Sequence, residues 1–200
     1  MADESDKKDK RVTVLIAEDN ASARRCLNDH LEALGYNVVA AAGDGETAVE
    51  EARRLKPALA ILDVKMPGMG GFEAAKEISS FLHIPIIIVS GYSSDELTNE
   101  AVEAGVFAYL VKPVTRKQLL PGIKLALARY EQFKKLKDEV KDLRDAVEAR
   151  KLIERAKGIL MRRCKIGEEE AFKLLQAHSQ KENKKMKDIA EMIVEASKLI

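Results

Sequence analysis

The chain lacks the segments that would export it or fix it in a membrane. Its first residues, 1–11, are polar and of mixed charge, without the apolar stretch of a signal peptide, and we expect a disordered tail there. The longest apolar run, at 84–89, is far shorter than the about 20 residues that a membrane-spanning helix needs. We therefore expect a cytoplasmic protein that makes no contact with membranes.

Cysteine and aromatic residues are also scarce. Cys26 and Cys164 lie far apart, and no CxxC pair or cysteine–histidine cluster occurs, so both are expected to be reduced thiols. The C-terminal residues 148–200 contain neither Trp nor Tyr, which leaves few rings that could stack on nucleic-acid bases. No haem, flavin or nucleotide signature is present.

Charge divides the chain into an acidic front and a basic back. Residues 12–115 carry 8 Lys and Arg against 15 Asp and Glu, a net charge of −7. Residues 116–147 and 148–200 each carry a net charge of +4. This asymmetry indicates that only the C-terminal part could bind a polyanion.

The first 115 residues alternate apolar, strand-like segments with helical patterns. Strands are predicted at 12–17, 38–42, 59–63, 85–90 and 107–111, and helices at 21–34, 45–55, 71–82, 95–104 and from 115 onward. Several strand segments are apolar at consecutive positions, as expected where both faces are buried. Five such units predict a doubly wound α/β fold with a five-stranded parallel sheet.

Beyond Pro113 the sequence predicts only helices. Thr115 and Gln118 have the spacing of a capping box, and Pro121-Gly122 is expected to kink or loosen the start of the helix. Apolar or small residues then recur with a period near 3.4, at Ile123, Ala126, Tyr130, Phe133, Leu136, Val140, Leu143 and Val147. That period favours a coiled-coil seam, with a helix packed on its own domain as the alternative.

The last fifty residues predict a small bundle of three helices, with turns at 164–167 and near 180–183. We therefore divide the chain into the tail 1–11, an α/β domain at 12–118, a helical coiled-coil linker at 119–147 and a helical domain at 148–200.

Four predicted strands end in polar residues, namely Glu18-Asp19, Asp63, Ser90 and Lys112. Because the carboxyl ends of parallel strands form the ligand crevice, these side chains should converge. Three carboxylates repel one another there, and a hard cation such as Mg²⁺ relieves that repulsion. For single groups the alternatives are an acidic pair that only caps the next helix and a lysine that is only a surface charge.

The groups at these strand ends suit phosphoryl transfer. Asp63 is the best presented carboxylate and a plausible nucleophile toward a phosphoryl donor. Lys112 would balance the charge of the transferred group, and Ser90 could donate its hydroxyl to a phosphoryl oxygen.

Residues 12–115 resemble the receiver domain of two-component response regulators. The resemblance is carried by the strand-end residues, the segment DVKMPGMGG at 63–71, and Lys112-Pro113 with its expected cis peptide bond. It implies phosphoryl transfer from a sensor histidine kinase to Asp63. It also implies Mg²⁺ held by Asp19 and Asp63, by Glu18 through water and by the backbone carbonyl of Lys65.

The same resemblance implies a switch. Tyr109 matches the aromatic position that turns inward when Ser90 moves toward the phosphoryl group, with an ordinary sheet-edge aromatic as the alternative. Added charge at Asp63 would then shift the population between two packings of the domain.

Residues 150–196 resemble the ANTAR domain, an RNA-binding antitermination module. The resemblance is carried by AKGILM at 156–161, Glu170-Ala171-Phe172 and Asp188-Ile189-Ala190. It implies binding of paired RNA stem-loops in nascent transcripts. The chain departs from the family's usual pattern at Gln176, where arginine is usual, and at His178, where a small residue is usual.

The residues of this segment also suggest an interface of their own. Arg155, Lys157, Arg162 and Arg163 are candidate phosphate contacts, with a solvated helix face as the alternative. Gly158 inside a helix costs about 1 kcal/mol relative to alanine, so we expect close approach of RNA or of a neighbouring helix. Phe172 is expected to lie in the core.

The sequence therefore predicts a phosphorylation-controlled RNA-binding antiterminator that forms a homodimer at least when phosphorylated. It shows no second catalytic constellation, so an enzyme is not expected. The alternatives are a receiver with a C-terminal dimerisation or protein-interaction module and, less favoured because the last helix is acidic and apolar, a DNA-binding regulator.

Overall fold

The computed structural model describes residues 11–91, 100 and 104–198, and the chain divides into two compact units, residues 1–133 and 134–200. The predicted tail at 1–11 and the predicted helix at 95–104 lie almost wholly outside the described residues. No helix among the described residues has both the length and the apolar composition that crossing a membrane requires.

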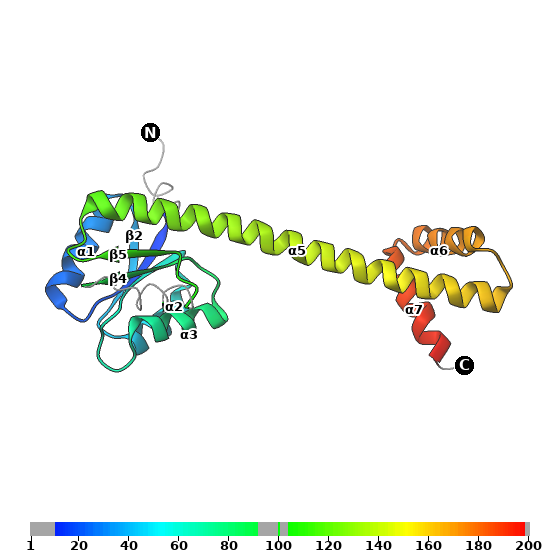
Figure 1. Cartoon of the computed structure of the whole chain (residues 1–200), viewed down its shortest axis with the longest axis horizontal. Coiled ribbons are helices and arrows are strands. Elements are labelled where there is room, and N and C mark those ends of the chain that lie inside the picture. Colours follow the sequence, from blue (N-terminus) through cyan, green and yellow to red (C-terminus); the bar gives the residue numbers. More distant parts are fainter. Residues whose placement is uncertain (1–10, 92–99, 101–103, 199–200) are drawn as a thin grey trace, which may run out of the picture. The chain divides into compact units, whose positions relative to one another are not determined.

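The first unit contains the predicted five-stranded parallel sheet (Figure 1). Its strands are β1 (Thr13–Ala17), β2 (Asn37–Ala42), β3 (Leu59–Asp63), β4 (Ile86–Ser90) and β5 (Ala108–Val111). Their order is β2-β1-β3-β4-β5, the arrangement in which the crevice lies between β1 and β3. Every residue of β3 and β4 is buried, as their continuous apolar sequences predict.

Helices cover both faces of the sheet. Helices α2 (Gly45–Leu55) and α3 (Gly71–Phe81) pack on one face, while α1 (Ala21–Ala33) and the start of α5 (Arg116–Cys164) pack on the other (Figure 1). Each face therefore has its own apolar core, and the carboxyl edge of the sheet lies between these two layers.

The start of α5 is anchored in the first unit. The backbone N–H of Thr115 donates to Gln118 Oε1 at 3.0 Å, as the predicted capping box requires. The helix continues through Pro121 without a break. A Cβ on Gly122 would lie 3.1 Å from Leu110 Cδ2, so glycine allows α5 to pack closely on β5.

The second unit consists of the remainder of α5 together with α6 (Glu168–Glu182) and α7 (Met186–Lys198). The first of the three predicted helices is the end of α5, because the sequence around residues 147–152 contains no helix-breaking residue. The helices pack around a small core whose buried members are Ala156, Leu175, Ile189 and Ala190.

The prediction that Phe172 is a core residue was wrong. Ala171 and Leu175 are fully buried, whereas Phe172 is 41 % exposed. Ala171 and Leu175 are four positions apart on one face of α6, and a residue one position further turns about 100° away from that face. The bundle is too thin to cover a second side of α6.

Candidate functional site

The carboxyl edge of the sheet brings together the three predicted carboxylates. One oxygen from each of Glu18, Asp19 and Asp63 lies within 4.8 Å of the others. Asp63 is the last residue of β3, and Glu18 directly follows β1, its neighbour in the sheet. Glu18 and Asp63 are buried, while Asp19 is exposed. The cluster is therefore open to solvent on one side only.

Lys112 neutralises part of this acidic cluster. Its Nζ lies 2.7 Å from Glu18 Oε2 and 2.9 Å from Asp63 Oδ2. Burial alone would lower the pKa of Lys112, but the hydrogen bonds with Glu18 and Asp63 outweigh it and raise the pKa above its usual value. The ammonium group thus stays protonated and bridges the two buried carboxylates.

The chain before α1 leaves both acidic residues available for this site. Asn20 is the N-cap of α1, and its side chain accepts from the backbone N–H groups of Ser22 and Ala23 at 3.0 Å. The alternative that the acidic pair only caps this helix therefore does not hold. The Arg24 guanidinium donates to the Glu18 carbonyl at 2.6 Å and helps to fix the pair. Sequence reasoning missed Arg24, because this contact is made across six positions, between the end of β1 and the first turn of α1.

The loop after Asp63 depends on close backbone contact. A Cβ on Gly71 would lie only 2.0 Å from the Asp63 carbonyl oxygen, which no side chain could tolerate. The backbone N–H of Val64 donates to the carbonyl of Val89 at 2.9 Å. Together these contacts hold the phosphoacceptor candidate against β4 on one side and against the start of α3 on the other.

The remaining predicted receiver residues surround the same edge. Ser90 is the buried last residue of β4, and its carbonyl accepts from the Lys112 backbone N–H at 2.8 Å. The Lys112-Pro113 peptide bond is cis, as the resemblance implied. Tyr109 is half-buried in β5 and packs against the core on the α2–α3 face. Lys65 lies exposed in the turn that follows Asp63.

The acidic cluster fits a magnesium ion. Mg²⁺ prefers carboxylate oxygens and water, and three carboxylates within 4.8 Å of one another supply the first of these at a partly open site. When bound, the ion would add positive charge next to Asp63, where a phosphoryl group would be received.

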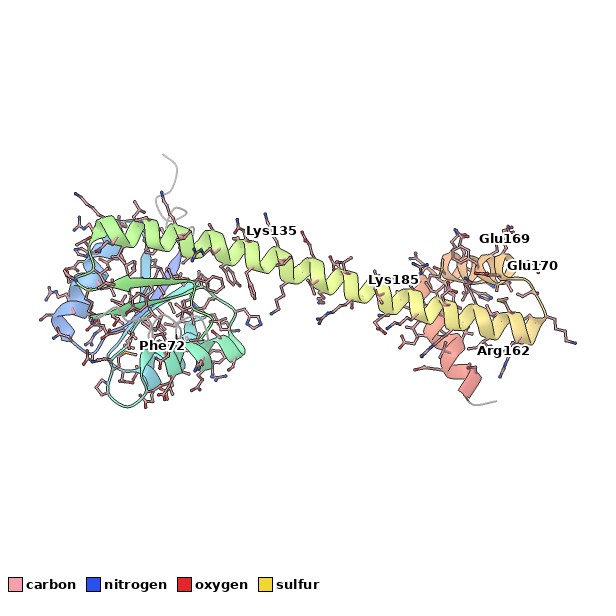
Figure 2. The ribbon with its side chains drawn as sticks, in the orientation of Figure 1. Phe72, Lys135, Arg162, Glu169, Glu170 and Lys185 are labelled. Atoms are coloured by element: carbon pink, nitrogen blue, oxygen red, sulfur yellow. The ribbon has the colours of Figure 1, made fainter. Side chains whose placement is uncertain are left out.

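In the second unit, a groove lies between α5 and α7. Its volume is about 410 Å³, and its lining consists of Glu154, Arg155, Gly158, Ile159, Arg162 and Val194. The Arg162 side chain, labelled in Figure 2, extends from the last turns of α5. Arg155 and Arg162 are both exposed and flank Gly158 on the same helix. The groove thus has two cationic side chains around a patch of bare backbone.

Among the described residues, no contact explains why Gly158 is a glycine. A Cβ there would meet only the flexible end of Arg162, at 3.7 Å, which is an ordinary van der Waals distance. We expected either a neighbouring helix or RNA to approach Gly158 closely, and no described helix does so. Close approach of an external molecule is the other expected reason for the glycine.

Lys157 differs from its basic neighbours because its charge is already paired. Its Nζ lies 2.9 Å from Glu154 Oε1 and 2.6 Å from Glu168 Oε1, and its side chain is only 9 % exposed. The hydrogen bonds with Glu168 and Glu154 raise the pKa of Lys157, and the same contact lowers the pKa of Glu168. Lys157 thereby ties α5 to the first turn of α6. Its predicted RNA contact stays a prediction.

The other residues singled out in this unit are exposed. Arg163 lies at the end of α5, and Gln176 and His178 lie on α6 beside the buried Leu175. They are accessible to a ligand, but the groove described above does not include them.

Two family models match the chain. The response regulator receiver domain matches residues 14–124, and the ANTAR domain matches residues 141–194. The fold, the acidic cluster and the C-terminal helices thus define a two-component regulator with an RNA-binding output. The chain belongs to the response regulators that carry a receiver domain followed by an ANTAR domain.

A curated relative is similar to this chain along nearly all of its length. The transcriptional regulatory protein PdtaR of Mycobacterium tuberculosis is 43 % identical over 182 residues, which cover 91 % of this chain and 89 % of that protein. The probable transcriptional regulator ycf27 of Porphyridium aerugineum is 36 % identical over 121 residues, covering 60 % of this chain and 49 % of that protein.

Solved structures match the receiver part. The signal receiver domain of a modulated diguanylate cyclase from Desulfovibrio desulfuricans superposes with a TM-score of 0.57 at 31 % identity, covering 62 % of this chain and 98 % of that one. The chemotaxis protein CheY4 of Vibrio cholerae gives 0.55 at 32 % identity, covering 58 % and 99 %.

Replacement of Lys112 should make the receiver more dependent on Mg²⁺. Lys112→Met leaves Glu18 and Asp63 close together without their shared cation, so their repulsion is uncompensated. We expect the melting temperature without metal to fall by several degrees, and the increase on adding Mg²⁺ to exceed that of the unsubstituted protein. Thermal unfolding followed by circular dichroism measures both. Lys76→Met, which removes an exposed charge from α3, is the control. An equal increase on adding Mg²⁺ in both variants would contradict this dependence on Lys112, and no increase in either would contradict a metal site at these carboxylates.

Replacement of Lys157 should destabilise the second unit in a pH-dependent manner. Lys157→Met keeps most of the side-chain volume but removes the bridge between α5 and α6. Because the pKa of Glu168 is lowered, the bridge stabilises the second unit fully at pH values above 4.5, the usual pKa of the group. This stabilisation is lost as the pH falls through the lowered pKa. Because the pKa of Lys157 is raised, the bridge persists up to at least 10.5 and is lost above it.

Thermal unfolding at several pH values tests this expectation. The melting temperature of Lys157→Met should lie below that of the unsubstituted protein at pH 7 and approach it below about pH 4.5. Lys173→Met breaks an exposed ion pair with Glu169 on α6 and should change little. The same melting temperature for both variants at pH 7 would mean that Lys157 has no such structural role.

Proposed function

We propose that phosphorylation of Asp63 by a sensor histidine kinase controls the binding of RNA stem-loops by residues 148–200. The bound stem-loops would lie in nascent transcripts, where their capture prevents formation of a terminator hairpin. In this proposal the protein acts in the cytoplasm as a regulator rather than an enzyme. It forms a homodimer at least when phosphorylated.

The proposed phosphorylation is a transfer between two side chains. The bond between phosphorus and the kinase histidine nitrogen breaks, and a bond forms between phosphorus and a carboxylate oxygen of Asp63. The Lys112 Nζ atom lies 2.9 Å from Asp63 Oδ2, so it is close enough to pair with the negative charge that the phosphoryl oxygens would bring. Ser90 would donate its hydroxyl to the same group.

This transfer would alter the segment that leads into α5. Lys112 now bridges Glu18 and Asp63, and a phosphoryl group would compete for its ammonium group. Lys112 is hydrogen-bonded to Ser90 through its backbone and precedes the first residue of α5, Arg116, by four positions. A change in the position of Lys112 would therefore alter the surroundings of Tyr109 in β5 and of the start of α5.

The single observation that carries the RNA-binding part is the groove around Gly158. Two exposed arginines flank a backbone surface where, of the described residues, only the end of the Arg162 side chain comes within 4 Å of an added Cβ. Guanidinium groups pair with phosphates and stack on exposed bases, and a glycine lets a nucleotide reach the helix backbone. Arg155, Gly158 and Arg162 are thus the proposed centre of the RNA interface, with Arg163 beside it.

A filter-binding titration on a tandem-hairpin leader RNA tests the switch. Beryllium fluoride with Mg²⁺, which mimics the phosphoryl group, should tighten binding, and Asp63→Ala should abolish that gain. Arg155→Ala/Arg162→Ala should weaken binding in both states. It should also reduce the slope of the logarithm of the binding constant against the logarithm of the salt concentration by about 0.7 per lost phosphate contact.

The matched control removes the same number of charges from α5 outside the groove. Lys134→Ala/Lys141→Ala alters two exposed lysines and should lower affinity far less. If no form of the protein binds the RNA specifically, the antitermination proposal fails, and a dimerisation or protein-interaction module becomes the better account of residues 148–200.

Replacement of Gly158 separates folding from binding. Gly158→Ala should stabilise the second unit by up to about 1 kcal/mol, because alanine favours a helix and its Cβ meets nothing closer than 3.7 Å. The same Cβ occupies the surface that RNA would approach, so affinity should fall. Thermal unfolding and the RNA titration measure the two effects. Unchanged affinity in a stabilised variant would exclude close RNA contact at Gly158.

A further inference from the structure

The loop at 64–70 joins the phosphoacceptor candidate Asp63 to α3. Its second residue is Lys65, whose backbone carbonyl is an expected ligand of Mg²⁺ beside the carboxylates. The neck of the loop is closed by the backbone N–H of Gly71, which donates to the Val64 carbonyl at 3.0 Å. This hydrogen bond fixes where the loop begins and ends, and leaves its tip to be held by other contacts.

The tip of this loop, residues 67–69, is held by the start of α2. The Met69 N–H donates to Glu46 Oε1 at 3.0 Å, a hydrogen bond between residues 23 positions apart. Gly68 has a φ of +68°, and a Cβ there would lie 2.7 Å from the same carboxylate oxygen. Glycine at this position therefore lets the carboxylate from α2 reach the backbone of the loop.

The start of α2 is suited to this contact in two ways. A Cβ on Gly45 would overlap the Met69 carbonyl oxygen and would lie 2.9 Å from Met69 Cβ, so glycine lets the helix pack directly on the loop. Asp44 caps the helix, because its side chain accepts from the Thr47 N–H at 2.7 Å. The cap does not depend on the Glu46 side chain, which is available to the loop.

An anchor at the tip matters because the loop carries groups that a metal ion must find in place. Mg²⁺ demands near-ideal octahedral geometry, so ligands that are already positioned bind it more tightly than ligands that it must first order. Gly68 and Gly70 give the loop backbone more conformational freedom than other residues would. A hydrogen bond to Met69 restricts that freedom before the metal binds. It thereby acts on the Lys65 carbonyl, four positions earlier in the same loop.

We propose that Glu46 is a positioning residue of the phosphoryl site. Through its hydrogen bond with Met69, it holds the loop at 64–70 in the arrangement that presents Asp63 and the Lys65 carbonyl to Mg²⁺. The inference rests on the phosphoacceptor role that the proposed function gives to Asp63. It involves neither RNA nor a second copy of the chain.

Calorimetric titration of the full-length protein with Mg²⁺ tests this role. Glu46→Ala should raise the dissociation constant for Mg²⁺ about threefold, as expected for the loss of one hydrogen bond that orders the site. Glu46→Gln removes the charge but keeps an oxygen that can accept from the Met69 N–H, so it should restore most of the affinity. Glu50→Ala removes an exposed carboxylate one turn further along α2 and should change the affinity far less.

Two outcomes of this titration would overturn the role of Glu46. The first is an unchanged dissociation constant in Glu46→Ala. The second is an equal loss of affinity in Glu46→Ala and Glu46→Gln, because the charge rather than the hydrogen bond would then be the cause. If the unsubstituted protein does not bind Mg²⁺, the phosphoryl site of the proposed function fails as well. If all the variants bind Mg²⁺ equally well, only the role of Glu46 fails.

Hydrogen exchange followed by mass spectrometry gives a second readout, which needs no metal. In Glu46→Ala the backbone amides of residues 64–70 should exchange faster than in the unsubstituted protein, while those of β3 should not change. Saturating Mg²⁺ should reduce the difference, because the metal then orders the loop itself. Unchanged exchange in the loop, or faster exchange throughout the receiver, would contradict a local positioning role.

Discussion

The receiver depends on the balance of charge at the carboxyl edge of its sheet. The strand order places β1 and β3 side by side at the centre, so Glu18 and Asp63 end up adjacent and largely removed from water. Two carboxylates placed so close repel each other, and a cation between them relieves that repulsion. Lys112, from the end of β5, supplies that cation across the intervening strand β4. A metal ion or a phosphoryl group at this edge would place its charge next to the Lys112 ammonium group.

The position of Lys112 in the chain links the carboxyl edge of the sheet to the start of α5. Its backbone is held to Ser90 at the end of β4, its peptide bond to Pro113 is cis, and α5 begins shortly after it. The first turns of α5 are anchored by Leu119, Ile123 and Ala126, all fully buried against the sheet. Because both ends of this short segment are fixed, a displacement of the Lys112 side chain has few ways to relax except through β5 and the start of α5.

The sequence was most informative where apolar runs end in polar residues. A short continuous apolar run is typical of a strand in a parallel sheet, and the polar residue that follows such a strand lies at the carboxyl edge of the sheet. That reasoning located Glu18, Asp63, Ser90 and Lys112 without any tertiary information. It could not identify Arg24, because its contact with the Glu18 carbonyl depends on how α1 leaves the sheet.

Helix faces in a small bundle were harder to predict. Phe172 and Lys157 lie on helices whose periodicity was recognised, yet the aromatic ring is exposed and the lysine is largely buried. Which side of such a helix is covered depends on one or two neighbouring helices rather than on hydropathy. Glu168, eleven residues after Lys157, becomes its partner only once α6 turns back along α5. No local pattern encodes that contact.

The second unit shows why an unfavourable residue can indicate function. Four apolar residues among those described are buried in its core, so the helices of this unit have little stability to spare. Lys157 supplies an ionic bridge at the corner between α5 and α6. Gly158, the next residue, weakens the same helix although no contact with another described residue requires a glycine at that position. The helix thus gains an ion-pair bridge at Lys157 and loses helix propensity at Gly158. The loss at Gly158 is consistent with the proposal that the surface over this residue stays open for a ligand.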